Sequence, residues 1–516
     1  MLAQDVSLPP MRRAVVLAGT VVLLVGPSVV AFFAGGYFAG PRVVAAGIAW
    51  TVVLLLAVAG PLPLPRSRAG TLAAIGLVGL AAWSALSLAW APLIAPVVDS
   101  VERLLLYLGA LFAAVALLRD PRAVRATEPL LALGALVAVG YGLAGRLVPA
   151  VVDLRSERSF GAGGRLEQPI TYWNAEGLLA AMGFLLCVRL AGDPSRPTAV
   201  RAAAAAGCAP LAMGIYLSYS RGAVAVAALG IVVLLAAAPT WSQLRAAGAA
   251  TLTGVAAAAS SAGLPGVASL TGTVGQQERD GATMTAILAV IVVGALLLSV
   301  RAARAERSGA ARCGRLPGAR RLGAVAAAAT ACCVVALVVA GLAENAERRE
   351  SASAAPARFA SLASVRYEYW RVGLLAFGDQ PVRGLGAGGF RVYWLKERRV
   401  AAGVVEVHSL VLEMAAELGL PGLLFLGLLL GGVAVAGRRA LARGSPLAPS
   451  ACAVCIAWLL HASIDWDWQL PAVTLPALVL AGGLLAASES PRSTVTVEAL
   501  PAERDRPEGE ITLAAG

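Results

Sequence analysis

Residues 423–436 read LLFLGLLLGGVAVA and continue a hydrophobic segment that begins near residue 410. A segment of roughly 20 apolar residues has the length that a helix needs to cross the ~30 Å hydrocarbon core of a bilayer. Similar runs recur along nearly the whole chain, and they are apolar on every side rather than alternating with period two, as barrel strands would. The sequence therefore predicts an all-α integral membrane protein.

The composition supports the same class, because 59% of the 516 residues are hydrophobic and only 14% are charged. The net charge of +12 comes almost entirely from arginine, since Lys396 is the one lysine among 42 basic residues. These arginines lie in short loops between apolar runs, a pattern typical of membrane topology. We therefore expect membrane lipids, and no nucleic acid, as partners.

About fourteen apolar runs are long enough to be spans, and we expect about 12 to 14 transmembrane helices. The ninth is the weakest, because it is rich in Ala, Ser and Gly and contains Pro265, which leaves open a broken or re-entrant segment. The runs lie near residues 14–35, 43–62, 70–90, 103–118, 129–145, 174–190, 202–219, 222–238, 246–267, 282–300, 322–343, 410–436, 446–464 and 470–487.

Loop charge predicts the orientation of these spans. With a cytoplasmic N-terminus, every even-numbered connection carries arginine on the inside, in agreement with the positive-inside rule. The arginines concerned are Arg66, Arg68, Arg119, Arg122, Arg125, Arg189, Arg196, Arg201, Arg245, the cluster from Arg301 to Arg321, Arg438, Arg439 and Arg443. We expect a multi-pass protein of the bacterial plasma membrane, with both termini cytoplasmic and two long external segments, residues 146–173 and 344–409.

The same topology divides the chain into four parts. Residues 1–343 hold the N-terminal transmembrane helices, and residues 344–409 form one long external loop that carries short helices. Residues 410–487 hold the C-terminal transmembrane helices, and residues 488–516 form a disordered cytoplasmic tail, because they are polar and rich in Pro, Ser and acidic residues.

The two histidines, His408 and His461, are both predicted at the outer ends of helices. An imidazole with a pKa near 6.5 accepts protons at neutral pH, so a histidine at a water-exposed mouth is a candidate general base. The seven cysteines, in contrast, lie in apolar spans or in a basic loop and indicate neither a disulfide framework nor a metal site.

A histidine motif directly precedes the hydrophobic segment that begins near residue 410. His408-Ser409 is followed by nine residues and then by Gly419-Leu420-Pro421-Gly422. The pattern of His, then Asn, Ser or Gln, nine residues and G-x-x-G resembles the signature of O-antigen ligases. Glu413 and Glu417 lie one turn apart on the same helix face, where they either orient a base or are solvated.

Other segments resemble the O-antigen ligase and O-antigen polymerase superfamily too, and all are predicted to be external. The similarity covers roughly residues 165–430. The segments are Tyr219-Ser220-Arg221-Gly222, which resembles T-x-S-R-G; Arg366 to Trp370, which resembles R-x-x-x-W; Pro381 to Phe390, which resembles P-x-x-G-x-G-x-x-x-F; and Arg165 with Tyr172-Trp173-Asn174-Ala175-Glu176.

The resemblance implies a metal-independent glycosyltransferase without a cofactor. Such an enzyme moves an oligosaccharide or polysaccharide from a polyprenyl diphosphate to an acceptor hydroxyl at the outer face of the plasma membrane. His408 is the expected general base, while Arg221 and Arg366 are the leading ligands of the diphosphate. Arg165 and Arg383 are weaker candidates, because an arginine near lipid headgroups is often only an interfacial anchor.

Asn174, Glu417, Asp465 and His461 are expected to support the site. His461 and Asp465 are four residues apart, which favours a hydrogen bond on one helix face. Asp465 and Asp467 have D-x-D spacing, which we interpret as structural support. Four tryptophans, Trp370, Trp394, Trp466 and Trp468, are expected in the interfacial belt.

Two other functions stay open. An O-antigen or exopolysaccharide polymerase shares these elements, so the sequence does not identify the acceptor, which is a lipid, a glycan or a protein. A polytopic transporter is the other alternative, although it would place ionisable residues near the bilayer midplane rather than at one surface.

Overall fold

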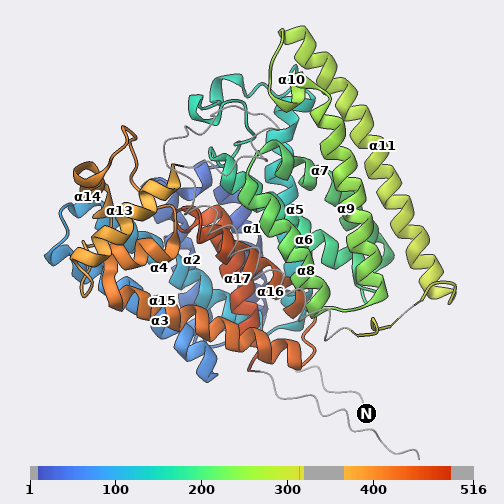
Figure 1. Cartoon of the computed structure of the whole chain (residues 1–516). Helices are drawn as coiled ribbons and strands as arrows, with labels where there is room; N and C mark the ends of the chain where they lie inside the picture. Colours follow the sequence, from blue (N-terminus) through green and yellow to red (C-terminus); the bar gives the residue numbers. More distant parts are fainter. Residues whose placement is uncertain (1–9, 313, 319–364, 490–516) are drawn as a thin grey trace, which may run out of the picture.

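A computed structural model describes residues 10–312, 314–318 and 365–489 of the protein (Figure 1). Within these ranges every named element is a helix, and Thr240 and Arg315 form an isolated β-bridge. The all-α prediction is thus confirmed for this part of the chain. The predicted span at 322–343, the loop residues 344–364, Cys313 and the tail from residue 490 lie outside the described residues.

Each predicted span within the described residues contains one long helix, and the ninth also includes the start of the short α10 (Pro265–Ala268). These helices are α1 (Pro10–Ala31), α2 (Ala39–Ala59), α3 (Arg68–Leu86), α4 (Ile94–Leu117), α5 (Pro121–Leu147), α6 (Trp173–Gly192), α7 (Thr198–Leu217), α8 (Arg221–Ala237), α9 (Trp241–Ala262), α11 (Val274–Arg307), α15 (Leu410–Ala442), α16 (Ala448–Ala462) and α17 (Pro471–Ala487).

The connections carry short elements. They are η1 (Ala34–Gly36), η2 (Ser87–Ala89), η3 (Arg155–Glu157), η4 (Phe160–Ala162), α10 (Pro265–Ala268), α13 (Arg366–Asp379), α14 (Phe390–Glu397) and η6 (Asp467–Gln469). Helices α13 and α14 lie in the segment predicted to be a long external loop.

Nine helices of the described part are long and apolar enough to cross a membrane: α1 to α7, α11 and α15. Helices α8, α16 and α17 are apolar but shorter. The weakest predicted span, residues 246–267, is divided between α9, a helix of 22 residues that is not among these nine, and the short α10, which begins at Pro265. The total of 12 to 14 crossings stays a prediction.

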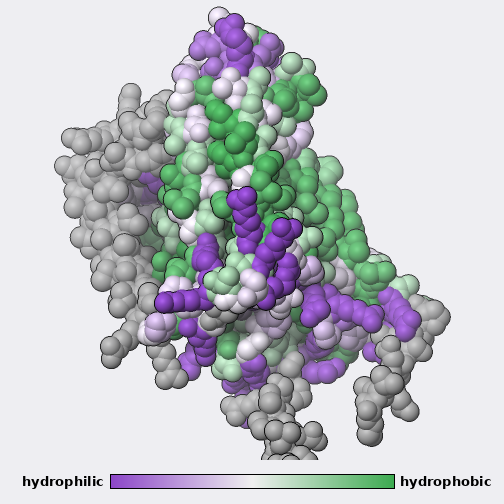
Figure 2. All heavy atoms as spheres, turned by 90° about the vertical axis from the view of Figure 1, so that its right-hand side faces the viewer, coloured by the Kyte–Doolittle hydropathy of each residue, from purple (hydrophilic) through white to green (hydrophobic). Residues whose placement is uncertain are grey.

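The outer surface has the polarity that a bilayer requires. On the face that carries α11, Figure 2 shows apolar side chains between hydrophilic groups at the two ends. Val290 and Val293 of α11 are 73% and 54% exposed, respectively, as expected for side chains that face lipid.

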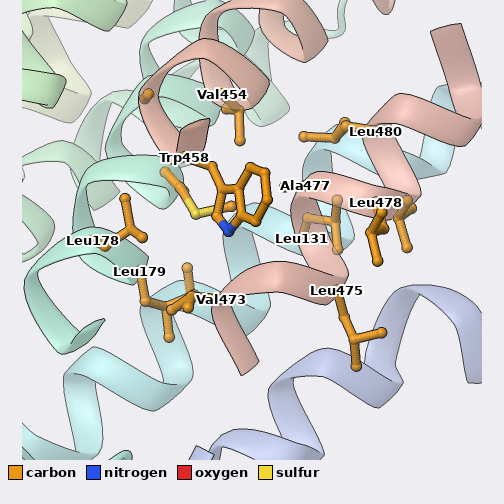
Figure 3. Packing of buried hydrophobic residues seen from close by; sticks show 14 of the residues in the cluster. Leu131, Leu178, Leu179, Val454, Trp458, Val473, Leu475, Ala477, Leu478 and Leu480 are labelled. Atoms are coloured by element: carbon orange, nitrogen blue, oxygen red, sulfur yellow. The ribbon is translucent and has the colours of Figure 1, made fainter. Parts of the chain in front are cut away.

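Helix α6 forms the centre of the bundle, and its most apolar 18-residue window is entirely buried. Leu178 and Leu179 of α6 lie near Trp458 of α16 and Val473 of α17 (Figure 3). Because lipid tails are as apolar as these side chains, close packing rather than escape from water holds such helices together.

The connections between helices separate into two ends of the bundle. At one end, which we call the arginine end, the predicted cytoplasmic connections meet: Arg119 donates hydrogen bonds to the carbonyl oxygens of Leu62 and Leu64, both at 2.7 Å. Arg443 donates to the carbonyl oxygen of Ser488. The other end, the site end, brings together the residues predicted to be functional. Which end faces the cytoplasm stays a prediction.

Candidate active site

The G-x-x-G motif marks a break in α15. Gly419 has φ 65° and ψ −154°, and a Cβ there would lie 2.7 Å from the carbonyl oxygen of Val382. Only glycine fits this combination of backbone angle and close contact without strain. The break therefore allows the segment around Val382 to dock against the first turns of α15.

Carbonyl groups freed by the break find new donors. The carbonyl oxygen of Ala416 accepts from the Leu385 amide at 3.0 Å, and that of Glu417 accepts from the Gly386 amide at 2.8 Å. The carbonyl oxygen of Leu418 accepts from the Trp83 indole at 2.9 Å. The P-x-x-G-x-G motif thus pairs with the backbone of the histidine motif, which explains why the two occur together.

Glu417 completes this docking, because its buried carboxylate accepts from the amides of Gly388 at 2.7 Å and Phe390 at 3.2 Å. Glu413 accepts a hydrogen bond from the Gln469 side chain. Both acids are buried, so the alternative in which they are simply solvated is wrong. They orient the segments around the histidine.

His408 lies just before α15 with φ 58°, which is uncommon for a non-glycine residue and costs backbone strain. Its Nδ1 donates to the carbonyl oxygen of Glu406 at 3.0 Å. In the neutral ring this bond leaves the lone pair on Nε2, as a general base requires. The half-buried ring lies between Tyr369 and Trp466, with ring centroids 5.1 Å and 6.1 Å away.

Glu406 is also buried beneath this loop, and Gln469 donates to it at 3.2 Å. Burial, together with the nearby Glu417, raises the pKa of Glu406 to about 8. The acid is therefore mainly protonated at neutral pH and does not add a full negative charge under His408.

Asp465 joins three distant segments. It accepts from Arg366 at 2.5 Å through Oδ2 and from the Tyr172 hydroxyl at 2.7 Å through Oδ1. Asn174 in turn donates to the Tyr172 oxygen at 2.8 Å. Burial by itself would raise the pKa of Asp465, but the charges of Arg366 and His408 hold it below its usual value. The ionised carboxylate fixes Arg366, whose side chain stays 22% exposed.

His461 has a different partner from the one that its spacing suggested. Its Nδ1 lies 2.6 Å from Oδ2 of Asp467, and the expected bond to Asp465 does not form. Helix α16 ends at Ala462, so residues 461 and 465 do not share a helix face. The two carboxylates of the D-x-D turn, which we call the aspartate turn (residues 465–467), face Arg366 and His461 respectively.

The other side of His461 meets the start of α8. Its Nε2 lies 3.5 Å from the Ser220 hydroxyl, which also accepts from the Ala223 amide as the N-cap of α8. A Cβ on Gly222 would lie 2.9 Å from the His461 ring. Half-buried Arg221, the first residue of α8, is therefore positioned by a chain that begins at Asp467.

The two weaker arginine candidates lie in other surroundings. Buried Arg165 donates to the carbonyl oxygens of Ala162 at 2.6 Å and Gly161 at 2.7 Å, and its guanidinium stacks 3.6 Å over Trp173. Arg383 is exposed, and it donates to the Gln380 side chain at 3.5 Å. Arg165 thus holds its own loop together, and Arg383 lies on the loop docked against α15.

The predicted interfacial position is wrong for two of the four tryptophans. Trp394 and Trp468 are 0% and 1% exposed, respectively, and belong to the interior. Trp370 and Trp466 are half-buried, and the Trp370 indole donates to the His408 carbonyl at 3.2 Å. Sequence reasoning also gave no role to Tyr172, although it stands in a quoted motif, nor to the pairing of Asp467.

These features define a class: a polytopic helical membrane protein with histidine, arginine and carboxylate side chains gathered at one end of its bundle. Residues 267–427, which include Arg366, His408 and Glu417, match the family model described as O-Antigen ligase (Wzy_C). The match confirms the resemblance to the O-antigen ligase superfamily. It supports a membrane glycan enzyme of the ligase or polymerase type, and the family implies a lipid-linked glycan substrate. No curated protein matches the chain.

Proposed function

We propose that the protein transfers a glycan from a polyprenyl diphosphate to an acceptor hydroxyl at the outer face of the plasma membrane, without a metal. The observation that carries the proposal is that His408 and Arg366 contact two adjacent residues, Trp466 and Asp465. His408 packs against Trp466, and the preceding Asp465 binds Arg366. A base and a fixed cation beside each other are what a displacement at a phosphorylated sugar needs.

The reaction follows from these groups. Nε2 of His408 takes the proton of the acceptor hydroxyl, and the oxygen attacks the anomeric carbon of the donor sugar. A new bond forms between this carbon and the acceptor oxygen, while the bond to the diphosphate oxygen breaks. One displacement inverts the anomeric configuration, and the polyprenyl diphosphate leaves with the bonding electron pair.

Arg366 and Arg221 bind the leaving group. A guanidinium forms planar, charge-assisted and often bidentate hydrogen bonds with phosphate, and it needs no metal to do so. Both arginines are the first residues of their helices, α13 and α8, where the helix dipole also favours negative charge.

Purified protein in liposomes tests the proposal. A synthetic polyprenyl-diphosphate oligosaccharide and a hydroxyl acceptor should yield a glycosylated acceptor, detected by mass spectrometry, in the presence of EDTA. His408→Gln should lower the rate by about 10²- to 10⁴-fold. Unchanged transfer by this variant would remove His408 as the base.

The same assay separates the ligase from its alternatives. A polymerase lengthens the donor glycan itself, whereas a ligase moves it unchanged to a different acceptor. Movement of labelled donor across the membrane without a covalent product would favour a transporter. Surface polysaccharide that is missing, short or unattached in a deletion strain would show which of these activities operates in the cell.

A further inference from the structure

A groove of about 560 Å³ runs along the flank of the bundle between α1, α2, α4 and α17. Its lining consists entirely of Gly, Ala, Pro, Val, Leu, Ile and Phe residues. The rim is open to the side, because Val29 of α1 and Val44 of α2 are 51% and 63% exposed. In a bilayer such a groove takes a hydrocarbon chain.

The groove is longer than an ordinary acyl chain needs. Along α1 it extends from Gly19 to Phe33, which corresponds to about 21 Å of helix. Half of the hydrocarbon core measures about 15 Å, and the acyl chain of a phospholipid stays within its own half. A chain that enters at the Phe33 end and fills the groove therefore passes the bilayer midplane.

The Phe33 end of the groove adjoins the candidate active site. Phe33 and Gly40 flank the turn that carries Tyr37, and the Tyr37 ring meets the Trp466 ring edge-on at 5.4 Å. Trp466 belongs to the aspartate turn, whose first residue binds Arg366. The Tyr37–Trp466 contact therefore links the turn at this end of the groove to the aspartate turn, which binds the arginine proposed to hold the diphosphate.

The charges at this end disfavour a phospholipid headgroup. Arg42 donates to the carboxylates of Asp99 and Glu102, and Asp99 stays 46% exposed. The phosphate of a phospholipid above the groove would meet these carboxylates beside an arginine that is already neutralised. A lipid whose diphosphate lies beyond Tyr37, at Arg366, avoids this repulsion.

We propose that this groove binds the polyprenyl chain of the lipid-linked donor. The assignment rests on the proposed function for the position of the diphosphate, but its test does not depend on glycan transfer. The chain leaves the diphosphate at Arg366, passes the Tyr37 and Trp466 rings and lies between α1 and α2.

Two glycines allow the groove to be filled without damage to the fold. Gly26 and Gly40 line it, and a Cβ at either position meets no atom within 4 Å. Gly26→Leu and Gly40→Leu therefore place a side chain where the polyprenyl chain would lie. Gly47→Leu is the matched control, because Gly47 lies on α2 in equally open surroundings but does not line the groove.

The probe is a long-chain polyprenyl diphosphate with a photoreactive group in its chain, incorporated into phosphatidylcholine liposomes with the intact protein. Mass spectrometry of the cross-linked peptides should find the label on α1 and α2 residues of the groove. Gly26→Leu should lower this labelling about tenfold, since several CH₂ contacts are lost, and Gly47→Leu should leave it unchanged.

Competition identifies the occupant. Unlabelled polyprenyl diphosphate should suppress the labelling, and added anionic phospholipid should not. The assignment would be overturned if Gly26→Leu were labelled as strongly as the wild type, or if phospholipid suppressed the labelling. It would also be overturned if the groove residues contacted a second copy of the chain and not the probe. Groove labelling without glycan transfer to any acceptor would instead reject the proposed function and leave the groove assignment standing.

Discussion

Arg119 and Arg366 lie at opposite ends of the bundle and have different contacts. At the arginine end, Arg119 donates to the carbonyl oxygens of Leu62 and Leu64 and to the carboxylate of Glu489, so it joins one connection to the end of α17. Other arginines at this end also bind buried acids, as Arg201 does with Glu306. At the site end, Arg366 binds the buried carboxylate of Asp465, which adjoins the Trp466 ring near His408, and its side chain stays 22% exposed. An ion pair with a buried acid is therefore common to both ends, and Arg366 is distinguished by the histidine and the aromatic rings beside its acid.

Arginines within the site end also differ from one another. Arg165 was a candidate ligand, but its bonds to two carbonyl oxygens resemble those of Arg119, and its guanidinium also stacks on Trp173. Charge and predicted topology were the same for Arg165 and Arg366, so only the partners separate them.

Arg366→Gln should have the largest effect. Loss of the cation proposed to stabilise the leaving group should lower the transfer rate about 10²- to 10³-fold. The variant also leaves Asp465 buried without its cation, so the double variant Arg366→Gln with Asp465→Asn serves as the control. We expect the double variant to regain thermal stability in detergent but not activity. Activity near wild type in either variant would contradict the role of Arg366.

Arg221→Lys should have the next largest effect. Lysine keeps the charge but loses the planar fork, and a hydrogen bond between charged groups contributes about 1.5–3 kcal/mol. We expect kcat/KM for the donor to fall about tenfold or more, with an unchanged melting temperature. Arg119→Lys is the matched control at the arginine end, and an equal loss in both variants would refute the distinction.

Asp467→Asn tests whether the aspartate turn positions Arg221 through His461. The weaker bond to His461 should raise KM for the donor up to about tenfold, as expected when a hydrogen bond to a charged group is weakened. Asp467→Glu should recover part of the loss. A role in folding alone would lower the melting temperature and leave KM unchanged, so both quantities are measured.

Arg165→Gln should affect stability rather than catalysis. The variant loses two hydrogen bonds to carbonyl oxygens and a cation–π contact, together about 1–3 kcal/mol. We expect a lower melting temperature and a kcat/KM close to that of the wild type once the folded fraction is taken into account. A selective rise in KM for the donor would instead restore Arg165 as a ligand.

Arg119→Gln should have the smallest effect on transfer, which we expect to be unchanged. The variant loses two hydrogen bonds to carbonyl oxygens and an ion pair with Glu489, together about 1–3 kcal/mol, so the melting temperature should fall about as much as in Arg165→Gln. A loss of activity at this distance from the site would show that the two ends are coupled.

Much of the fold could be predicted because long apolar runs form helices in a bilayer, and a helix lies at each predicted span wherever the chain is described, although α8, α16 and α17 are shorter than a typical crossing. The break at Gly419 was harder to predict, because the G-x-x-G motif indicated a close approach to the backbone but did not identify the approaching segment. The partners within the site were not accessible, because Tyr172, Arg366 and Asp465 are far apart in sequence and meet only through the fold. The partner of His461 was predicted wrongly for a local reason. Residues four apart share a helix face only where the helix continues, and α16 ends at Ala462.

The break in α15 has a mechanical consequence. Beyond Gly419, Phe425 and Leu429 pack against Gly76 of α3, whereas the turns before it are bonded to the 381–390 loop and to Gln469. Membranes differ in thickness by several ångströms, and helices respond by tilting. We expect a tilt of the lipid-facing part of α15 to pivot at Gly419 and to leave His408 and its neighbours in register, so that the geometry of the candidate site would depend little on the thickness of the bilayer.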